Sequence, residues 1–324
     1  MEKPLIYITR KIPNDVIKPY ESNFQFKMWT SEDTPVPRDI LFQEAKRADG
    51  LLCMLSDQID EELLYQAPQL KVVANLAVGY DNIDLLAAEK QSVVVTNTPD
   101  VLTETTADLT FALLLATARR LIEAYEFIKD DQWEHWSPYL LAGADVHQQT
   151  IGIVGMGRIG EAVARRATGF GMSILYHNRT RKLETEKELN TTYVSFDELV
   201  RTSDFVVSLV PLTDATEHLF NESVFKQMKS SAIFINVSRG QTVDEEALYN
   251  ALKTGEIAAA GLDVFKDEPI SSNHPLMNLD NVVCLPHIGS ASRKTREEML
   301  HLCLRNLEGY FVGDGPLTPV RFIK

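Results

Sequence analysis

The sequence has few cysteines, no long hydrophobic run and fewer basic than acidic residues. Its three cysteines, Cys53, Cys284 and Cys303, are far apart and form no C-x-x-C pair. We therefore expect free, buried thiols and neither a disulfide framework nor a metal centre. The longest apolar run, 109–118, is well short of the roughly 20 residues that cross a bilayer. The N-terminal apolar stretch 5–8 is too short for a secretory signal, so we expect a cytoplasmic protein with no membrane partner.

Basic residues are outnumbered by acidic ones, 32 to 46, which gives a formal net charge of −14. A strongly acidic chain is a poor partner for nucleic acid. The hydrophobic fraction of 44% and the charged fraction of 24% are typical of a globular protein. The length of 324 residues suggests two domains. A site for an anion in this chain would need locally concentrated positive groups.

Short β-branched runs alternate with amphipathic stretches, which predicts parallel βαβ units and an α/β fold. The strands that we expect are 4–9, 49–54, 71–75, 92–96, 150–154, 173–177, 204–210, 232–237, 258–263 and 281–285. The expected helices include 37–46, 60–65, 158–167 and 293–310. Two further helices are predicted to begin at capping boxes, Ser195-x-x-Glu198 and Thr242-x-x-Glu245, the second ending near Gly255.

The segment 103–125 has the pattern of one long helix, of the kind that carries a chain from one domain to another. The segment 130–146 follows it, and we call this segment the arm. The arm contains Trp133, Trp136 and Tyr139 in an irregular stretch. Such aromatic residues either cover the protein's own core or pack on a partner subunit, and the sequence leaves both interpretations open.

Gly155-x-Gly157-x-x-Gly160 is the most specific local motif, because a predicted strand precedes it and a predicted helix follows. The first glycine permits a tight turn, the second a close approach of a pyrophosphate, and the third close helix–strand packing. The free N–H groups of the helix N-terminus would then bind the phosphates. The motif predicts dinucleotide binding, against the simpler interpretation of a tight turn.

The residues that would meet the adenosine ribose are unusual. An acid commonly lies about 20 residues after the glycines and binds the ribose 2′-OH. Here the sequence is Asn178-Arg179-Thr180-Arg181-Lys182, which we call the ribose loop. Guanidinium groups and a hydroxyl would hold a 2′-phosphate, so we predict a preference for NADP(H), with NAD(H) possible. A solvated basic loop without selectivity is the alternative.

Three ionisable residues follow predicted strands in the second half of the chain, namely Arg239, Glu268 and His287. Ligands of open α/β sheets bind at such strand ends. The competing interpretations are a core histidine, an arginine bonded to a backbone carbonyl and an ordinary surface acid. A solvated role is the default for five other histidines: His135, His147, His218, His274 and His301.

Five ordered motifs carry a resemblance that covers essentially the full chain. They are the segments 155–160, 210–213, 235–240, 261–265 and 285–290. The sequence resembles the D-isomer-specific 2-hydroxyacid dehydrogenases, and within that family it is most similar to the glyoxylate/hydroxypyruvate reductases. The segments 50–57 and 288–292 are closest to that branch.

The resemblance implies two doubly wound parallel-sheet domains. A Rossmann coenzyme domain, 101–290, would be inserted into a flavodoxin-like substrate domain formed by 1–100 and 291–324. It also implies a homodimer in which the arm contributes to the interface. The reaction would be the NADPH-preferring reduction of a small 2-oxo acid, glyoxylate or hydroxypyruvate, to the D-2-hydroxy acid.

The resemblance also implies a role for each site residue. His287 would donate the proton, Glu268 would stabilise its charged form, and Arg239 would hold the substrate carboxylate and polarise the carbonyl. The backbone N–H groups of Val78 and Gly79 would face the carboxylate, and Leu55 would line the pocket. The cofactor would contact Gly155, Gly157, Arg158, Ile159, Gly160, Asn178, Arg179, Thr180, Val210, Pro211, Val237, Ser238 and Asp263.

Two alternatives stay open at this point. A 2-ketogluconate reductase of the same family would use the same residues and differ in the pocket walls. A corepressor-like interaction protein would share the fold and bind NAD(H). The basic ribose loop argues against the corepressor.

Overall fold

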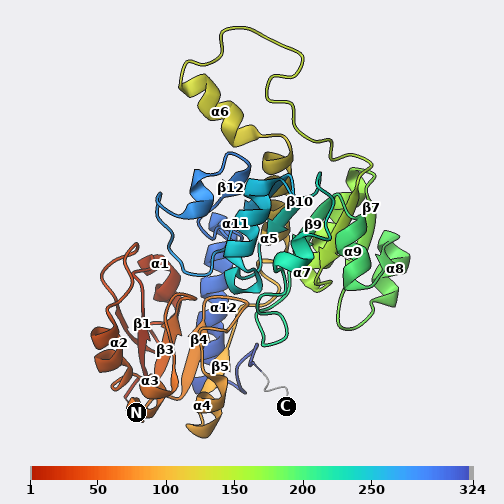
Figure 1. The fold of residues 1–324 in the computed structure, drawn as a ribbon. Coiled ribbons are helices and arrows are strands. Elements are labelled where there is room, and N and C mark those ends of the chain that lie inside the picture. Colours follow the sequence, from red (N-terminus) through yellow and green to blue (C-terminus); the bar gives the residue numbers. More distant parts are fainter. Residues whose placement is uncertain (1, 321–324) are drawn as a thin grey trace. The chain divides into compact units, whose positions relative to one another are not determined.

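The computed structural model describes residues 2–320 and divides into two compact units. Unit 1 combines Met1–Leu102 with Ser292–Lys324, and unit 2 is Thr103–Ala291. Each unit is built on one parallel sheet with helices between the strands (Figure 1). The predicted α/β class with two parallel-sheet domains is confirmed.

Unit 1 has a five-stranded parallel sheet in the order β2-β1-β3-β4-β5. This is the flavodoxin-like order, and its switch point lies between β1 and β3. The strands are β1 (Leu5–Ile8), β2 (Gln25–Met28), β3 (Gly50–Cys53), β4 (Val72–Asn75) and β5 (Val94–Thr96). The helices are α1 (Asn14–Ile17), α2 (Arg38–Ala45), α3 (Glu61–Gln66), α4 (Leu85–Lys90) and α12 (Arg293–Phe311).

The burial of each strand in unit 1 explains whether it could be predicted from the sequence. Strands β3 and β4 are buried along their whole length, which is why their sequences are almost entirely apolar. Strand β2 lies at the edge of the sheet and alternates exposed with half-buried residues. Its sequence, Gln-Phe-Lys-Met, has only two apolar residues, and we did not predict it.

Unit 2 has a seven-stranded parallel sheet in the order β12-β11-β10-β9-β6-β7-β8. Its first strand, β6, is interior, with β7 on one side and β9 on the other, which is the Rossmann arrangement with a switch point between β6 and β9. The strands are β6 (Thr150–Val154), β7 (Ser173–His177), β8 (Thr192–Tyr193), β9 (Phe205–Ser208), β10 (Ile233–Asn236), β11 (Ala259–Leu262) and β12 (Val282–Cys284). The helices are α5 (Thr103–Ala118), α6 (Leu121–Lys129), α7 (Arg158–Gly169), α8 (Leu183–Leu189), α9 (Phe196–Thr202), α10 (Glu222–Phe225) and α11 (Glu245–Thr254).

The prediction of one helix over 103–125 is wrong, because the chain breaks between α5 and α6. Arg120 takes a left-handed conformation with φ 53°. The end of α5 is stabilised by the returning arm, since the N–H of Ala144 donates to the carbonyl of Ala118 at 2.8 Å. The guanidinium of Arg120 binds Glu123 in the first turn of α6. These long-range and local bonds replace the hydrogen bonds that a continuous helix would make.

The aromatic residues of the arm do not cover the core of their own unit, although Val146 at the end of the arm is buried in it. Trp133, Trp136 and Tyr139 are 58%, 76% and 88% exposed, and α6 has no buried residue. Figure 1 shows α6 and the chain after it extending away from the rest of unit 2. Of the two interpretations of these aromatic residues, the first is therefore wrong.

One of the two predicted capping boxes is also wrong. Ser195 begins α9 as expected and accepts a hydrogen bond from the N–H of Glu198. Thr242, in contrast, lies in a short 3-10 turn, and its hydroxyl donates to the carbonyl of Arg239. The N-cap of α11 is Asp244, whose carboxylate accepts from the N–H of Ala247. The helix ends at Gly255 in a left-handed conformation, as predicted.

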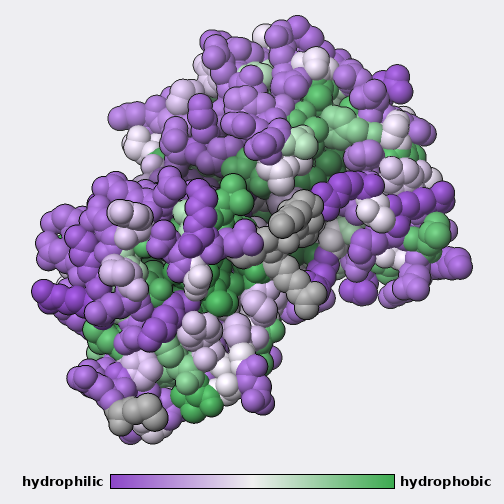
Figure 2. All heavy atoms as spheres, turned by 90° about the horizontal axis from the view of Figure 1, so that it is seen from below, coloured by the Kyte–Doolittle hydropathy of each residue, from purple (hydrophilic) through white to green (hydrophobic). Residues whose placement is uncertain are grey.

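The surface of the molecule is dominated by polar residues on the face that Figure 2 shows, where hydrophobic residues occupy smaller areas. Cys53 and Cys303 are buried free thiols, as expected, whereas Cys284 is only half-buried. Within residues 2–320, no helix is both long and apolar enough to cross a membrane.

Candidate active site

Three adjacent strands of unit 2 lead into the predicted catalytic residues. Strands β10, β11 and β12 are neighbours and run parallel, so their carboxyl ends lie at one edge of the sheet. Arg239, Glu268 and His287 follow these three strands in turn. The predicted motifs, far apart in sequence, thus converge on one edge of the sheet because of the strand order.

His287 and Glu268 form a direct pair. Nδ1 of His287 lies 2.7 Å from Oε2 of Glu268, and the two side chains are only 24% and 28% exposed. The second carboxylate oxygen accepts from the N–H of Phe265 at 2.9 Å. Because Glu268 occupies Nδ1, the other ring nitrogen, Nε2, is the one that can serve a substrate.

The environment of Glu268 favours its charged form. Burial alone would raise the pKa of this carboxyl group. The hydrogen bond and charge of His287, the N–H of Phe265 and the charge of Arg239 together outweigh burial and lower the pKa. Glu268 is therefore an ionised hydrogen-bond partner of the imidazole ring.

Asp263 fixes the chain that carries His287. Its side chain is completely buried, and its two oxygens accept hydrogen bonds of 2.7 Å each from the N–H groups of Ile288 and Gly289. Burial raises the pKa of this carboxyl group in spite of the two N–H donors. His287 itself has a left-handed backbone with φ 53°, so its orientation depends on such contacts.

Arg239 is half-buried in the turn after β10. One guanidinium nitrogen donates to the carbonyl of Ser238 at 2.9 Å. The carbonyl of Arg239 accepts from Asn236 and Thr242, which fixes the turn. The backbone bond that we considered as the alternative is thus present, together with the predicted position at a strand end.

The glycine turn between β6 and α7 has the geometry that its sequence predicts. Gly155 has φ +102°, and a Cβ on Gly160 would lie 2.2 Å from the carbonyl oxygen of Gly155. Gly157 is the N-cap of α7, and nothing lies within 4 Å of where its Cβ would be. The turn therefore leaves open space beside the free N–H groups of a 12-residue helix, at the switch point of the sheet. This arrangement fits the pyrophosphate of a dinucleotide.

The other predicted cofactor residues follow strands of the same sheet. Val210 and Pro211 come after β9, and Val237 and Ser238 come after β10. Ser238 is 9% exposed, and its hydroxyl forms hydrogen bonds with the side chains of Asn236 and Ser208. The structure thus places all of the predicted cofactor residues along one edge of one sheet.

The ribose loop follows β7, and its cations are not equivalent. Arg181 forms two hydrogen bonds of 2.8 Å with the carboxylate of Glu186. Those bonds from Arg181, and one from Tyr176, lower the pKa of Glu186 to about 2. Arg179 and Thr180 are exposed, and Asn178 donates to the carbonyl of Thr180. Within residues 2–320, Arg179 forms no ion pair.

The predicted substrate residues Leu55, Val78 and Gly79 belong to unit 1, on the chain that follows β3 and β4. All three are half-buried. Asn97 donates to the carbonyl of Val78 at 2.8 Å, and Asn75 donates to that of Gly79 at 2.9 Å. These two bonds fix the orientation of the peptide groups in this stretch.

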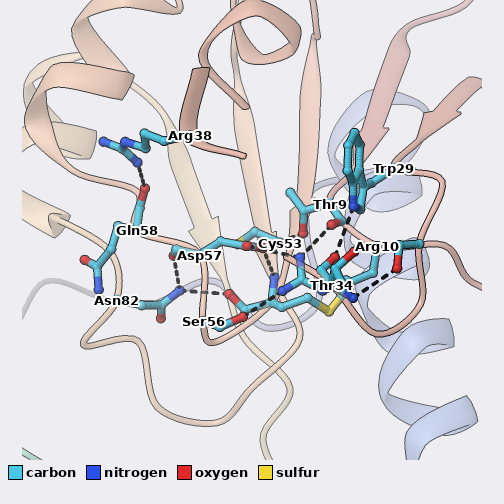
Figure 3. Close-up of polar contacts among 12 residues, drawn as sticks. Thr9, Arg10, Trp29, Thr34, Arg38, Cys53, Ser56, Asp57, Gln58 and Asn82 are labelled. Carbon is cyan, nitrogen blue, oxygen red and sulfur yellow. Dashed lines mark hydrogen bonds and ion pairs between the residues drawn. The ribbon is translucent and has the colours of Figure 1, made fainter. Parts of the chain in front are cut away.

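A buried polar network at the same edge was not predicted (Figure 3). Asp57 accepts from the hydroxyl of Thr9 and from the N–H of Met54, and it pairs with Arg10 at 3.4 Å. Asn82 donates to the carbonyls of Met54 and Asp57. The network joins the chain after β1 to the chain after β3, which carries Leu55.

Only the structure reveals why these residues matter. Asp57, Asn75 and Asn82 are 5%, 0% and 6% exposed, although each is polar. A polar residue that ends an otherwise apolar strand is a signal that could have found Asn75, whereas Asp57 lies four residues beyond the end of β3. Asn82 lies in an irregular segment and gives no such signal.

Comparisons with known proteins agree with this geometry. The family model "D-isomer specific 2-hydroxyacid dehydrogenase, NAD binding domain" matches residues 111–289. This chain belongs to that family. A glyoxylate reductase of Thermococcus onnurineus is 52% identical over 322 residues, which are 98% of this chain and 96% of that protein.

Solved structures extend the likeness to the fold. A protein from Thermus thermophilus superposes with a TM-score of 0.91 at 42% identity, with 98% of this chain and 100% of that chain covered. The NADPH-dependent glyoxylate/hydroxypyruvate reductase of Sinorhizobium meliloti, in complex with NADP and malonate, has a TM-score of 0.86 at 36% identity and covers 99% of this chain and 100% of its own. The family and the glycine turn together make this dehydrogenase an NAD(P)-dependent oxidoreductase that acts on a small acid. The corepressor-like alternative is set aside.

Proposed function

We propose that this dehydrogenase reduces small 2-oxo acids, glyoxylate and hydroxypyruvate, with NADPH as the preferred cofactor. A prochiral substrate would yield the D-2-hydroxy acid. Unit 2 (103–291) would be the coenzyme domain and unit 1 (1–102 and 292–324) the substrate domain. The names of the relatives support this choice of substrate.

The observation that carries the proposal is the His287–Glu268 pair at 2.7 Å, at the ends of the two strands that come next in the sheet after the strand leading into Arg239. Reduction of a carbonyl group requires a proton for the oxygen, and the pair supplies one at Nε2 of His287. Glu268 stabilises the imidazolium before the transfer. A guanidinium at the neighbouring strand end can bind a carboxylate through two parallel hydrogen bonds.

The chain's own residues would perform the following steps. Arg239 and the N–H groups of Val78 and Gly79 bind the substrate carboxylate, and Leu55 lines the pocket. Bound NADPH supplies the hydride for the carbonyl carbon. Arg239 polarises the carbonyl group, and His287 transfers its proton to the carbonyl oxygen.

Glycines and helix α7 would bind the pyrophosphate, with Arg158 and Ile159 in the first turn of the helix. Val210, Pro211, Val237 and Ser238 would line the cofactor site along the same edge. Asp263 would lie at the nicotinamide end of the cofactor site. Its bonds to Ile288 and Gly289 leave no carboxylate oxygen without a hydrogen bond.

The preference for NADPH would depend mainly on Arg179. Arg181 is held by Glu186, so its charge is largely compensated, whereas Arg179 and the hydroxyl of Thr180 are exposed. A 2′-phosphate would pair its negative charge with Arg179 and accept a hydrogen bond from the hydroxyl of Thr180. Arg181 would instead position the loop.

A homodimer would account for the exposed apolar surface of α6 and the arm. Leu121, Ile122, Tyr125 and Ile128 on α6 are each at least 50% exposed, as are Trp133, Trp136 and Tyr139. Large apolar side chains exposed together on one segment are typical of an interface. Sedimentation would show a dimer that Trp136→Glu weakens.

Steady-state kinetics test the proposed function. We expect the highest kcat/KM for glyoxylate or hydroxypyruvate with NADPH, and lower values for 2-ketogluconate and with NADH. Arg179→Ala should raise the KM for NADPH about tenfold and leave the KM for NADH unchanged. Arg181→Ala, the matched control, should have the smaller effect. Higher kcat/KM for 2-ketogluconate would favour the alternative reductase, and an unchanged KM in Arg179→Ala would refute the role of Arg179.

A further inference from the structure

The chain after β11 carries Glu268 on an exposed stretch, in which Lys266, Asp267, Glu268 and Pro269 are all exposed at the residue level. A surface segment of this kind is mobile unless it is tied down. Glu268 is bonded to His287 and to the N–H of Phe265. Neither bond involves the backbone of Lys266 or of the residues after Glu268.

Glu245, in the first turn of α11, contacts Lys266 at the start of the exposed stretch and His274 further along the chain. Its Oε1 accepts from the N–H of Lys266 at 2.6 Å. Its Oε2 lies 3.4 Å from Nε2 of His274. The side chains of Glu245 and His274 are each only 20% exposed, so His274 is not the solvated histidine that we predicted.

The two carboxylates of this region bind successive N–H groups. Phe265 donates to Glu268, and the next residue, Lys266, donates to Glu245. The two N–H groups belong to consecutive peptide groups that meet at the Cα of Phe265, and the backbone at Phe265 therefore links the two acids. A shift of Lys266 away from Glu245 would turn the N–H of Phe265 away from Glu268.

The peptide group between Phe265 and Lys266 also packs against the turn that carries Arg239. A Cβ on Gly240 would lie 1.8 Å from the carbonyl carbon of Phe265, so only glycine permits this approach. The side chain of Gln241 donates to the carbonyl of Lys266 at 2.9 Å. On the other side, the ring of Phe265 packs edge-on against His274 at 5.7 Å.

We propose that Glu245 is a positioning residue for proton transfer. Through its contacts with Lys266 and His274 it fixes the conformation of residues 266–274 and thereby keeps Glu268 in contact with His287. The proposal rests on the proposed function, since it concerns the same proton. Glu245 touches neither His287 nor Glu268 directly and acts through the backbone of residues 265 and 266. The two oxygens of the carboxylate serve two contacts eight residues apart: one accepts from the N–H of Lys266, and the other lies 3.4 Å from Nε2 of His274.

Glu245→Gln tests the proposal, because it keeps the size of the side chain but turns an N–H₂ group toward one of the two donors. Glu246→Gln is the matched control. Glu246 is the next residue in the same first turn, and it is exposed. Both variants lose one acid near the helix N-terminus, but only the first disturbs Lys266 and His274.

We expect kcat for glyoxylate to fall at least tenfold in Glu245→Gln, because small displacements of catalytic groups have large effects. The KM for glyoxylate and the Kd for NADPH should change less than threefold, and Glu246→Gln should behave like the wild type. His274→Ala should reproduce the loss of kcat, and His274→Gln, which retains a donor, should restore most of it. The His274 pair also tests the proposal if Glu245→Gln does not fold.

A double-mutant cycle decides whether Glu245 acts through Glu268. In the Glu268→Gln background, Glu245→Gln should have no further effect on kcat. An equal loss in both backgrounds, or a kcat in Glu245→Gln within twofold of the wild type, would overturn the proposal. Wild-type protein without 2-oxo acid reductase activity would instead refute the proposed function.

Discussion

The two units use different chemistry at the carboxyl edges of their parallel sheets. In unit 2, ionisable side chains follow three adjacent strands, and the buried carboxylate of Asp263 holds the chain that carries His287. In unit 1, the amides of Asn75 and Asn82 hold the corresponding chain, and Asp57 is paired with Arg10. Unit 2 presents charged groups, and unit 1 presents fixed peptide groups and Leu55.

The difference matches the two tasks of the proposed reaction. A proton must move during the reaction, which needs a group that titrates and a charged partner beside it. The substrate carboxylate keeps its charge throughout, so the fixed N–H groups of unit 1 can help Arg239 to bind it without taking part in the proton transfer. Variants of the His287–Glu268 pair should therefore change kcat, whereas variants of the unit 1 network should change the KM for the 2-oxo acid.

The largest expected effect is that of His287→Gln. It removes the proton donor, and kcat for glyoxylate should fall by about 10²- to 10⁴-fold. The Kd for NADPH, measured by fluorescence titration, should stay within threefold of the wild type. A kcat close to that of the wild type would show that unit 2 does not supply the proton.

Asn82→Ala tests the opposite side of the comparison. The substitution removes the side-chain donor to the carbonyls of Met54 and Asp57, and of these two only the carbonyl of Met54 keeps a backbone donor among the described residues, so the chain that carries Leu55 should lose its fixed position. We expect the KM for glyoxylate to rise about tenfold with kcat nearly unchanged, because binding is weakened equally before and during the reaction. Unfolding should become easier by about 1–3 kcal/mol. A fall in kcat at constant KM would break the division between the units.

Glu268→Gln should change how stability depends on pH. The pKa of Glu268 is lowered from 4.5 in the folded protein, because its bonds and charge partners outweigh burial. The ionised carboxylate thus stabilises the fold above pH 4.5, and this contribution disappears as the pH falls through the lowered pKa. The difference in unfolding free energy between wild type and Glu268→Gln, measured with urea, should shrink below pH 4.5. A constant difference would mean that the pair with His287 does not stabilise the fold.

Ser195→Ala should have the smallest effect and serves as a stability control. Ser195 caps α9 and has no place in the proposed site. Loss of the cap should cost about 1 kcal/mol in urea unfolding, with kcat and KM unchanged. If this variant altered the KM as Asn82→Ala does, loss of stability alone would explain both.

The sequence predicted the elements whose signal is local. The glycine turn at 155–160 was predicted from the spacing of its three glycines. The buried strands β3 and β10 were predicted because they are almost entirely apolar. His287, Glu268 and Arg239 were found because each follows such a strand. Their convergence depends on strand order, which the family resemblance implied.

The rest depends on contacts that sequence patterns do not encode. The break at Arg120 requires the returning N–H of Ala144, and the start of α11 at Asp244 depends on Thr242 bonding to Arg239. The charge of Arg181 is compensated by Glu186, which lies in helix α8 and not in the ribose loop. Each of these contacts joins residues whose proximity is set by the fold.

The product of hydroxypyruvate reduction tests the central claim most directly. Purified protein, hydroxypyruvate and NADPH are incubated, and the glycerate formed is resolved by chiral chromatography and compared with the NADPH consumed. A substrate held by the groups of unit 1 and protonated by His287 should give D-glycerate, one molecule for each NADPH oxidised. Formation of L-glycerate, or NADPH oxidation that does not depend on the added 2-oxo acid, would contradict the account.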